Sequence, residues 1–198
     1  MLDHAAARQP ADERITWRQA DTLALPFDDG AFDVVLCQFG AMFFPDRPAG
    51  YGEARRVLRT GGSFIFNVWD RIEANGFSDL VTRTAAEVFP HDPPQFLVRT
   101  PHGYHDTEQV RQDLAKAGYS DISITTLQEV SRAATARDAA IAYCMGTPLR
   151  SEIEVRDSAK LDLVTDLATQ AIANKFGDGT ANGSVEGKIS GHVITANR

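Results

Sequence analysis

The chain has 198 residues, of which 43% are hydrophobic and 24% are charged; these are the proportions of a globular domain and argue against a disordered or collagen-like chain. Twenty basic against 27 acidic residues leave a formal net charge of −7, which argues against a nucleic-acid partner because phosphate binding needs a basic surface. No apolar run is long enough to cross a membrane, and the first residues do not form a secretory signal. Cys37 and Cys144 lie in apolar stretches, so we expect reduced cysteines in a cytoplasmic protein without a membrane partner.

Apolar periodicity predicts alternating helices and strands. In the first part we expect a helix over 2–8, a strand over 15–18, a turn over 25–30, a strand over 32–38 buried on both faces, a helix from Asp46 to Thr60, and a buried strand over 63–69. In the second part we expect a helix over 77–89, a Pro-rich loop over 90–101, a helix from Asp106 to Gly118, a strand over 122–126, helical segments over 135–145 and about 156–176, a Gly-rich loop over 177–187, and a strand over 188–196. This order predicts one α/β layered domain with a largely parallel sheet.

Polar residues follow three of the predicted strands, where ligands bind in open α/β sheets. They occupy positions 20–22, 38–42 and 69–70. Asp21 stands just before an apolar segment over 23–27, and a carboxylate beside an apolar wall suits a flat heterocycle that bears an amine. The alternative, which spacing alone favours, is that Asp21 merely caps a turn.

Two ordered blocks of sequence, residues 21–35 and 53–62 with the apolar strand that follows, resemble class I S-adenosylmethionine-dependent methyltransferases. The similar branch is the small-molecule group that includes the ubiquinone and menaquinone biosynthesis methyltransferases. The resemblance covers about residues 1–70 and implies a three-layer Rossmann-like fold with a mostly parallel sheet. It also implies S-adenosylmethionine as the cofactor.

The resemblance assigns cofactor-binding roles to four residues. Asp21 matches the acidic position that accepts a hydrogen bond from the adenine amine, and Thr22 matches the neighbour whose backbone N–H approaches the ring. Gln38 and Phe39 match the strand end beside the methionine portion and the sulfonium. Residues 61–62 match a structural turn.

The chain departs from the family pattern at its start. In the family a first strand, a Gly-rich loop and a second strand precede the equivalent of Leu2, and such a unit needs about 30 residues. We therefore expect a domain over 1–198 that is truncated at the N-terminus, lacks those elements and binds the cofactor poorly. The strand over 32–38 then becomes an edge, so either residues 15–18 shift inward or two chains form a homodimer along this edge.

The segments over 71–105 and 133–174 are expected to cover the methyl acceptor. Within or beside the first lie four candidates for taking a proton from a hydroxyl or amine: Asp70, His102, Tyr104 and His105. The alternative is that they are polar residues of a solvated loop. No helix carries His102 and His105, so we expect no metal site. Arg55, Arg56 and Arg59 are interpreted as a solvated face.

The sequence thus predicts methyl transfer from S-adenosylmethionine to a small-molecule acceptor. This reaction is a direct displacement, so the protein aligns acceptor, methyl group and sulfur and excludes water. The alternative is a non-catalytic remnant that acts as a binding or dimerisation module. A nucleotide-binding protein of another family is a third hypothesis, and no phosphate-binding motif supports it.

Overall fold

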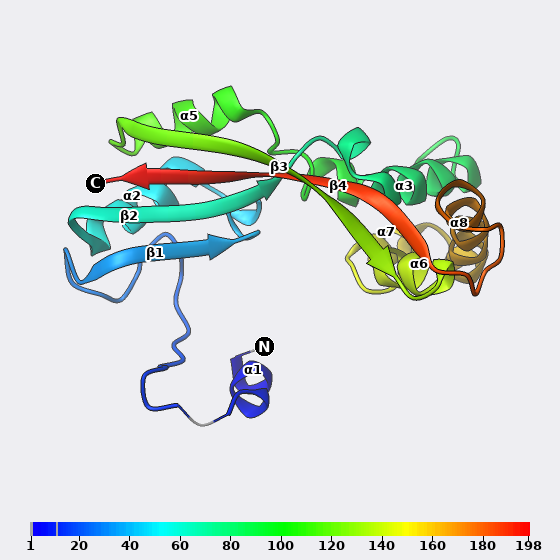
Figure 1. Ribbon diagram of the computed structural model, residues 1–198, viewed down its shortest axis with the longest axis horizontal. Coiled ribbons are helices and arrows are strands. Elements are labelled where there is room, and N and C mark those ends of the chain that lie inside the picture. Colours follow the sequence, from blue (N-terminus) through cyan, green and yellow to red (C-terminus); the bar gives the residue numbers. More distant parts are fainter. Residues whose placement is uncertain (1, 11) are drawn as a thin grey trace.

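A mixed four-stranded sheet is the centre of the computed structural model, which describes residues 2–10 and 12–198 (Figure 1). The strands are β1 (Phe32–Gln38), β2 (Leu58–Trp69), β3 (Asp121–Ala133) and β4 (Val185–Asn197), in the order β1-β2-β4-β3. Strand β1 is parallel to β2, whereas β4 is antiparallel to both β2 and β3. The predicted α/β class is confirmed, but a mostly parallel sheet is not, because β4 runs against both of its neighbours.

The described helices fall into three groups. Helix α1 (Leu2–Arg8) lies away from the sheet, while α2 (Arg47–Val57) and α5 (Thr107–Lys116) lie along it (Figure 1). The helices α3, α6, α7 and α8 gather at the far end of β3 and β4 (Figure 1). Their bounds, with those of the short helices, are α3 (Gly76–Val88), α4 (Phe96–Arg99), α6 (Ala136–Cys144), α7 (Leu149–Asp157), α8 (Leu161–Phe176), η1 (Ala41–Phe43), η2 (Ile72–Ala74) and η3 (Ser158–Lys160). No helix in the described part of the chain is both long enough and apolar enough to cross a membrane.

Two hydrophobic cores follow from this arrangement. The first fills the space between one sheet face and the helices α2 and α5, with Tyr51, Phe66 and Leu114 fully buried in it. The second lies within the helices at the far end and includes Ile153 and Ile172. The ladder between β3 and β4 runs from Asp121 opposite Asn197 to Ala133 opposite Val185, so these two strands extend past both cores.

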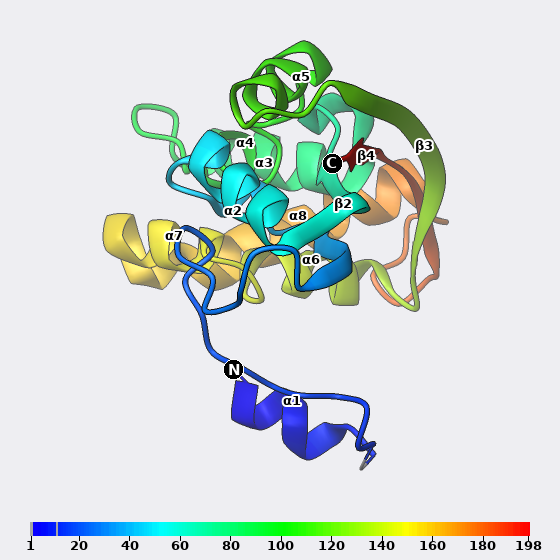
Figure 2. The ribbon, with the colours of Figure 1, turned by 90° about the vertical axis from the view of Figure 1, so that its left-hand side faces the viewer.

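The other face of the sheet is not covered by a helix in the part of the chain that the structure describes (Figure 2). Val34 is 48% exposed and Leu36 is 73% exposed on this face. The three-layer arrangement is therefore corrected to two layers over the described residues. The expectation that β1 is buried on both faces is also wrong, since these two side chains are exposed.

Several helix ends form where the sequence predicts them. The Asp46 side chain accepts a hydrogen bond from the backbone N–H of Ala49, and Pro48 occupies the first turn of α2. Asp106 caps α5 by accepting from two backbone N–H groups, and Gly118 follows the helix with a φ of +90°. The Gln109 side chain bonds to another part of α5, so the predicted capping box is only half formed.

The segment over 15–18 is not a strand. It forms no ladder with β1 and its side chains are exposed, so it has not shifted inward to cover the sheet edge. The predicted helix over 2–8 is confirmed as α1. A strand needs a neighbour to satisfy its backbone hydrogen bonds, and this segment has none among the described residues.

Candidate functional site at the carboxyl end of the sheet

Phe39 follows the last residue of β1 and has an unusual backbone conformation. Its φ of +48° makes it the one non-glycine residue with a positive φ in the described part of the chain. Its backbone N–H donates to the side-chain oxygen of Asn67 at 2.8 Å, and its ring stacks on Trp69 with centroids 3.9 Å apart. A left-handed backbone persists only where its surroundings hold it, so Asn67 and Trp69 fix Phe39 in place.

A shallow apolar cavity of about 190 Å³ lies against this aromatic pair on the uncovered face of the sheet. Phe39, Asn67 and Trp69 form one side, and Leu127 and Ile189 form the other. Gln38, the preceding residue, is exposed beside it. Two of the four predicted cofactor-binding residues, Gln38 and Phe39, therefore lie together at one strand end.

Asp21 and Thr22 lie elsewhere, on the exposed chain before β1. The Asp21 carboxylate accepts a hydrogen bond from the backbone N–H of Leu23 at 2.9 Å, and the Asp21 carbonyl accepts one from Ala24. The structure therefore shows Asp21 capping a turn, which is the alternative that its spacing favoured.

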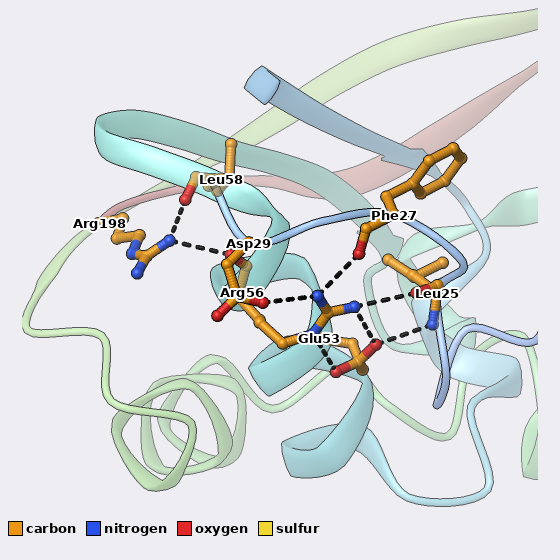
Figure 3. Close-up of polar contacts among 7 residues, drawn as sticks. All are labelled: Leu25, Phe27, Asp29, Glu53, Arg56, Leu58 and Arg198. Carbon is orange, nitrogen blue, oxygen red and sulfur yellow. Dashed lines mark hydrogen bonds and ion pairs between the residues drawn. The ribbon is translucent and has the colours of Figure 1, made fainter. Parts of the chain in front are cut away.

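Arg56 holds the loop between this turn and β1 (Figure 3). Its guanidinium donates to the carbonyls of Leu25 and Phe27 and to the carboxylates of Asp29 and Glu53, at 2.8–2.9 Å. Glu53 also accepts from the Leu25 N–H at 2.8 Å, and its pKa is lowered chiefly by the hydrogen bonds from Arg56. The interpretation of Arg56 as part of a solvated face is corrected, because its donors organise this loop.

Asp70 and His102 meet at the end of β2. The Asp70 carboxylate accepts from the Arg71 N–H at 2.7 Å and from the Ser190 hydroxyl at 2.9 Å. Burial raises the pKa of Asp70, but these hydrogen bonds and the nearby His192 outweigh it, so the pKa is lowered overall. The His102 Nδ1 lies 2.8 Å from the Asp70 carbonyl oxygen.

His105 bonds to the same loop, whereas Tyr104 does not belong to this group. His105 Nδ1 lies 2.8 Å from the His102 carbonyl oxygen. Tyr104 is buried in the sheet core, where its hydroxyl donates to Asp113 at 3.0 Å and contacts the Tyr51 hydroxyl at 3.3 Å. The structure thus brings Asp70, His102 and His105 together and separates Tyr104 from them.

A second cavity, of about 140 Å³, lies next to Trp69 and His102. Its remaining walls come from α3, α4, β4 and the region at and after the end of α6, where Tyr143 and Thr147 line it. It therefore forms where the two segments expected to cover an acceptor, 71–105 and 133–174, meet. Sequence reasoning missed Tyr143 and Thr147 individually, and their place inside the second segment was the available signal.

By their positions in the described part of the chain, His102 and His105 do not form a metal site. Among the described residues there is no group of three or more His, Cys, Asp or Glu side chains placed to hold a metal ion. His102 and His105 instead direct Nδ1 at backbone carbonyls.

Comparison with known proteins finds similarity to methyltransferases. Residues 1–66 match the family model described as a methyltransferase domain. The resemblance to class I S-adenosylmethionine-dependent methyltransferases is confirmed over this part of the chain. A ubiquinone/menaquinone biosynthesis C-methyltransferase of Dinoroseobacter shibae is 28% identical over 131 residues, which are 62% of this chain and 52% of the relative. A demethylmenaquinone methyltransferase of Thermus thermophilus is 45% identical over 64 residues, 31% of this chain and 29% of the relative.

Solved structures of methyltransferases share the fold. A protein described as a methyltransferase from an antibiotic biosynthesis pathway of Anabaena variabilis has a TM-score of 0.59 and 14% identity, covering 98% of this chain and 77% of its own. The [4+2]-cyclase SpnF has a TM-score of 0.51 and 16% identity, and the match covers 100% of this chain and 61% of the cyclase. The chain spans about half the length, or less, of the curated relatives above. Because SpnF is named for a different reaction, the shared fold does not fix the chemistry.

Proposed function

We propose that this chain takes part in methyl transfer from S-adenosylmethionine to a small-molecule acceptor, and that the acceptor is a quinol-type ring. The observation that carries the proposal is the pair of cavities on either side of Trp69, one beside Phe39 and the other beside His102. The names of the curated relatives, which are quinone methyltransferases, support the acceptor class. The net charge of −7 supports a partner other than nucleic acid, and the free cysteines support a cytoplasmic location.

The residues at the strand end fit part of the cofactor. When bound, S-adenosylmethionine supplies a methyl group on a positively charged sulfur. In the proposal, Gln38 and Phe39 contact its methionine portion, and Asp21 and Thr22 lie towards its adenine. The fit is incomplete, because the cavity beside Phe39 has about 190 Å³, whereas ligand pockets typically have about 300–1,000 Å³. We therefore expect this 198-residue chain to bind the cofactor weakly.

Titration calorimetry with S-adenosylmethionine tests this expectation. The proposal predicts weak binding that Phe39→Ala abolishes and that Val155→Ala, at an exposed position on α7, leaves unchanged. Micromolar affinity contradicts the expected weakness. Methyl transfer to hydroquinone, followed by mass spectrometry, tests the reaction itself, and its absence at saturating cofactor would reject the enzymatic role for this chain.

A second candidate function is a binding or dimerisation module that uses β1. The support is that β1 has one strand neighbour, β2, and exposes Val34 and Leu36 beside its other edge. An edge of this kind is a template for pairing with another chain. Sedimentation of the purified chain separates the two candidates, since a stable dimer without methyl transfer favours the module.

A further inference from the structure

The cavity lined by Trp69, Leu97, His102, Tyr143, Thr147 and Ile189 has the size of a single ring. Its volume is about 140 Å³, and an apolar protein cavity of about 150 Å³ is known to hold one benzene molecule. Aromatic and aliphatic side chains provide most of its surface. A flat apolar ring would therefore fill it, and two fused rings would not fit.

Most polar side chains that line the cavity are already committed to the backbone. Asn75 donates to two carbonyls and accepts from one backbone N–H group. The Ser78 and Thr147 hydroxyls each donate to a backbone carbonyl, at 3.1 and 2.7 Å. These three residues shape the walls rather than offering hydrogen bonds to a ligand.

His102 is different, because one of its ring nitrogens is left over. The side chain is buried, with the residue 6% exposed. Its Nδ1 lies 2.8 Å from the Asp70 carbonyl oxygen, which can only accept, so Nδ1 carries the proton. Burial lowers the pKa of His102, so the ring is neutral at pH 7. Nε2 therefore keeps a lone pair, and it makes no hydrogen bond to a described residue.

We propose that this cavity binds a single six-membered ring that carries a hydroxyl group, and that the hydroxyl donates to Nε2 of His102. The inference deepens the proposed function, since the ring would be the methyl acceptor. In the proton transfer the hydroxyl O–H bond breaks, the proton bonds to Nε2, and the electron pair stays on oxygen. His102 becomes an imidazolium, and the ring becomes a better nucleophile towards a methyl group.

The experiment uses phenol as the probe and needs no cofactor. In the full chain, phenol should cause a saturable change in the ¹⁵N NMR shift of His102 Nε2, and benzene should compete with it more weakly. The fused ring of 1-naphthol should bind at least roughly tenfold more weakly, because the cavity holds one ring. Leu97→Phe, which fills the cavity, should abolish phenol binding.

Two variants isolate His102. His102→Asn keeps an N–H where Nδ1 stood, so it retains the donor to Asp70 while removing Nε2. It should weaken the binding of phenol but not the binding of benzene. His91→Gln, at an exposed histidine in the preceding loop, is the matched control and should change neither.

The possible results separate the two proposals. Absence of saturable phenol binding overturns the cavity as a ring site, and equal affinity for 1-naphthol overturns the size limit. Phenol binding without a shift at Nε2 overturns the role of His102. If phenol binds as expected but hydroquinone is not methylated, the ring site stands and the methyl transfer fails.

Discussion

His102 and Tyr104 are two residues apart, yet their side chains belong to different parts of the molecule. His102 lines the cavity next to Trp69, whereas Tyr104 lies in the sheet core beneath the guanidinium of Arg47, whose central carbon is 4.0 Å from the ring centroid. Burial raises the pKa of the Tyr104 hydroxyl far above its usual range, so this hydroxyl stays protonated and donates to Asp113. In the proposal above, His102 rather than Tyr104 therefore accepts the proton.

Tyr104→Phe tests this division at the residue scale. The change removes the hydroxyl that donates to the buried Asp113 carboxylate, and we expect a loss of about 1–2 kcal/mol in the free energy of unfolding. Urea denaturation measures it. Phenol binding should be unchanged, because Tyr104 does not line the cavity. A tenfold loss of phenol affinity would show instead that Tyr104 contributes to the acceptor site.

The pH dependence of stability follows from His102. Because burial lowers its pKa below the ordinary value of 6.5, the unfolded chain binds this proton more tightly than the folded one. The folded state thus has its full stability above pH 6.5 and loses stability as the pH falls through that value towards the lower folded pKa. Urea denaturation at a series of pH values should show this loss, and His102→Asn should show less of it. Equal slopes in the two proteins would contradict the assignment.

At the element scale, β1 is one of the two edge strands of the described sheet, with β3 at the opposite edge. It carries one charged residue, Asp33, which pairs with Arg59, and it has no Pro or Lys of the kind that protects edge strands. Its exposed side chains Val34 and Leu36 point to the uncovered face. These features favour pairing with a second copy of the same strand.

The expected register makes that pairing testable. In an antiparallel pair of two β1 strands, full pairing of all seven residues places Val34 opposite Leu36 of the second copy. Val34→Lys/Leu36→Lys puts like charges opposite one another and should give a monomer in sedimentation velocity. Val34→Glu/Leu36→Lys should restore the dimer, because opposite charges then meet. Val155→Lys, at an 86% exposed site, is the control; a dimer that survives both lysines contradicts this register.

Local signals predicted most of the longer helices but missed α4, inside the predicted loop over 90–101, and α7, and they predicted the strands less well. Asp46 and Asp106 mark helix starts because capping depends on neighbouring residues, so one short stretch of sequence contains the signal. Strand length depends on the partner strand instead. β3 extends well beyond the predicted 122–126, as far as Ala133, and β4 extends slightly beyond the predicted 188–196, because each continues the other's ladder. Residues 15–18 have a strand-like pattern but no neighbouring strand, so the pattern alone misled.

The same reasoning explains what was predictable in the candidate site. The rule that ligands bind beyond the ends of strands led to Phe39, Trp69 and Asp70, and the Pro-rich loop predicted over 90–101 led to His102 beside it. Tyr143 and Thr147 come from a helix end far along the chain, and their approach to Trp69 depends on the packing of the second core. No spacing in the sequence predicts that Tyr143 and Thr147 lie close to Trp69.

At the scale of the whole molecule, two cores share the long ladder of β3 and β4. Breaking either core should unfold the other, because the ladder cannot lose half of its supporting helices and keep its register. Leu114→Ala in the sheet core and Ile172→Ala in the helical core should each cost about 2–5 kcal/mol. Each of these substitutions is made in a Trp17→Phe background, so that Trp69 is the remaining tryptophan. In both variants, tryptophan fluorescence and far-ultraviolet circular dichroism should then give the same urea midpoint. Two separate midpoints would show that the cores unfold independently.

Arg198 follows the last residue of β4 and bonds to β2. Its backbone N–H donates to the Gly62 carbonyl, its carbonyl accepts from the Gly61 N–H, and its guanidinium reaches back to the carbonyls of Arg56 and Leu58. An affinity tag or fluorophore fused there would pull on the turn that starts β2 and, through α2, on the Arg56 loop. Labels for imaging or surface capture belong on α1, which stands clear of both cores (Figure 1).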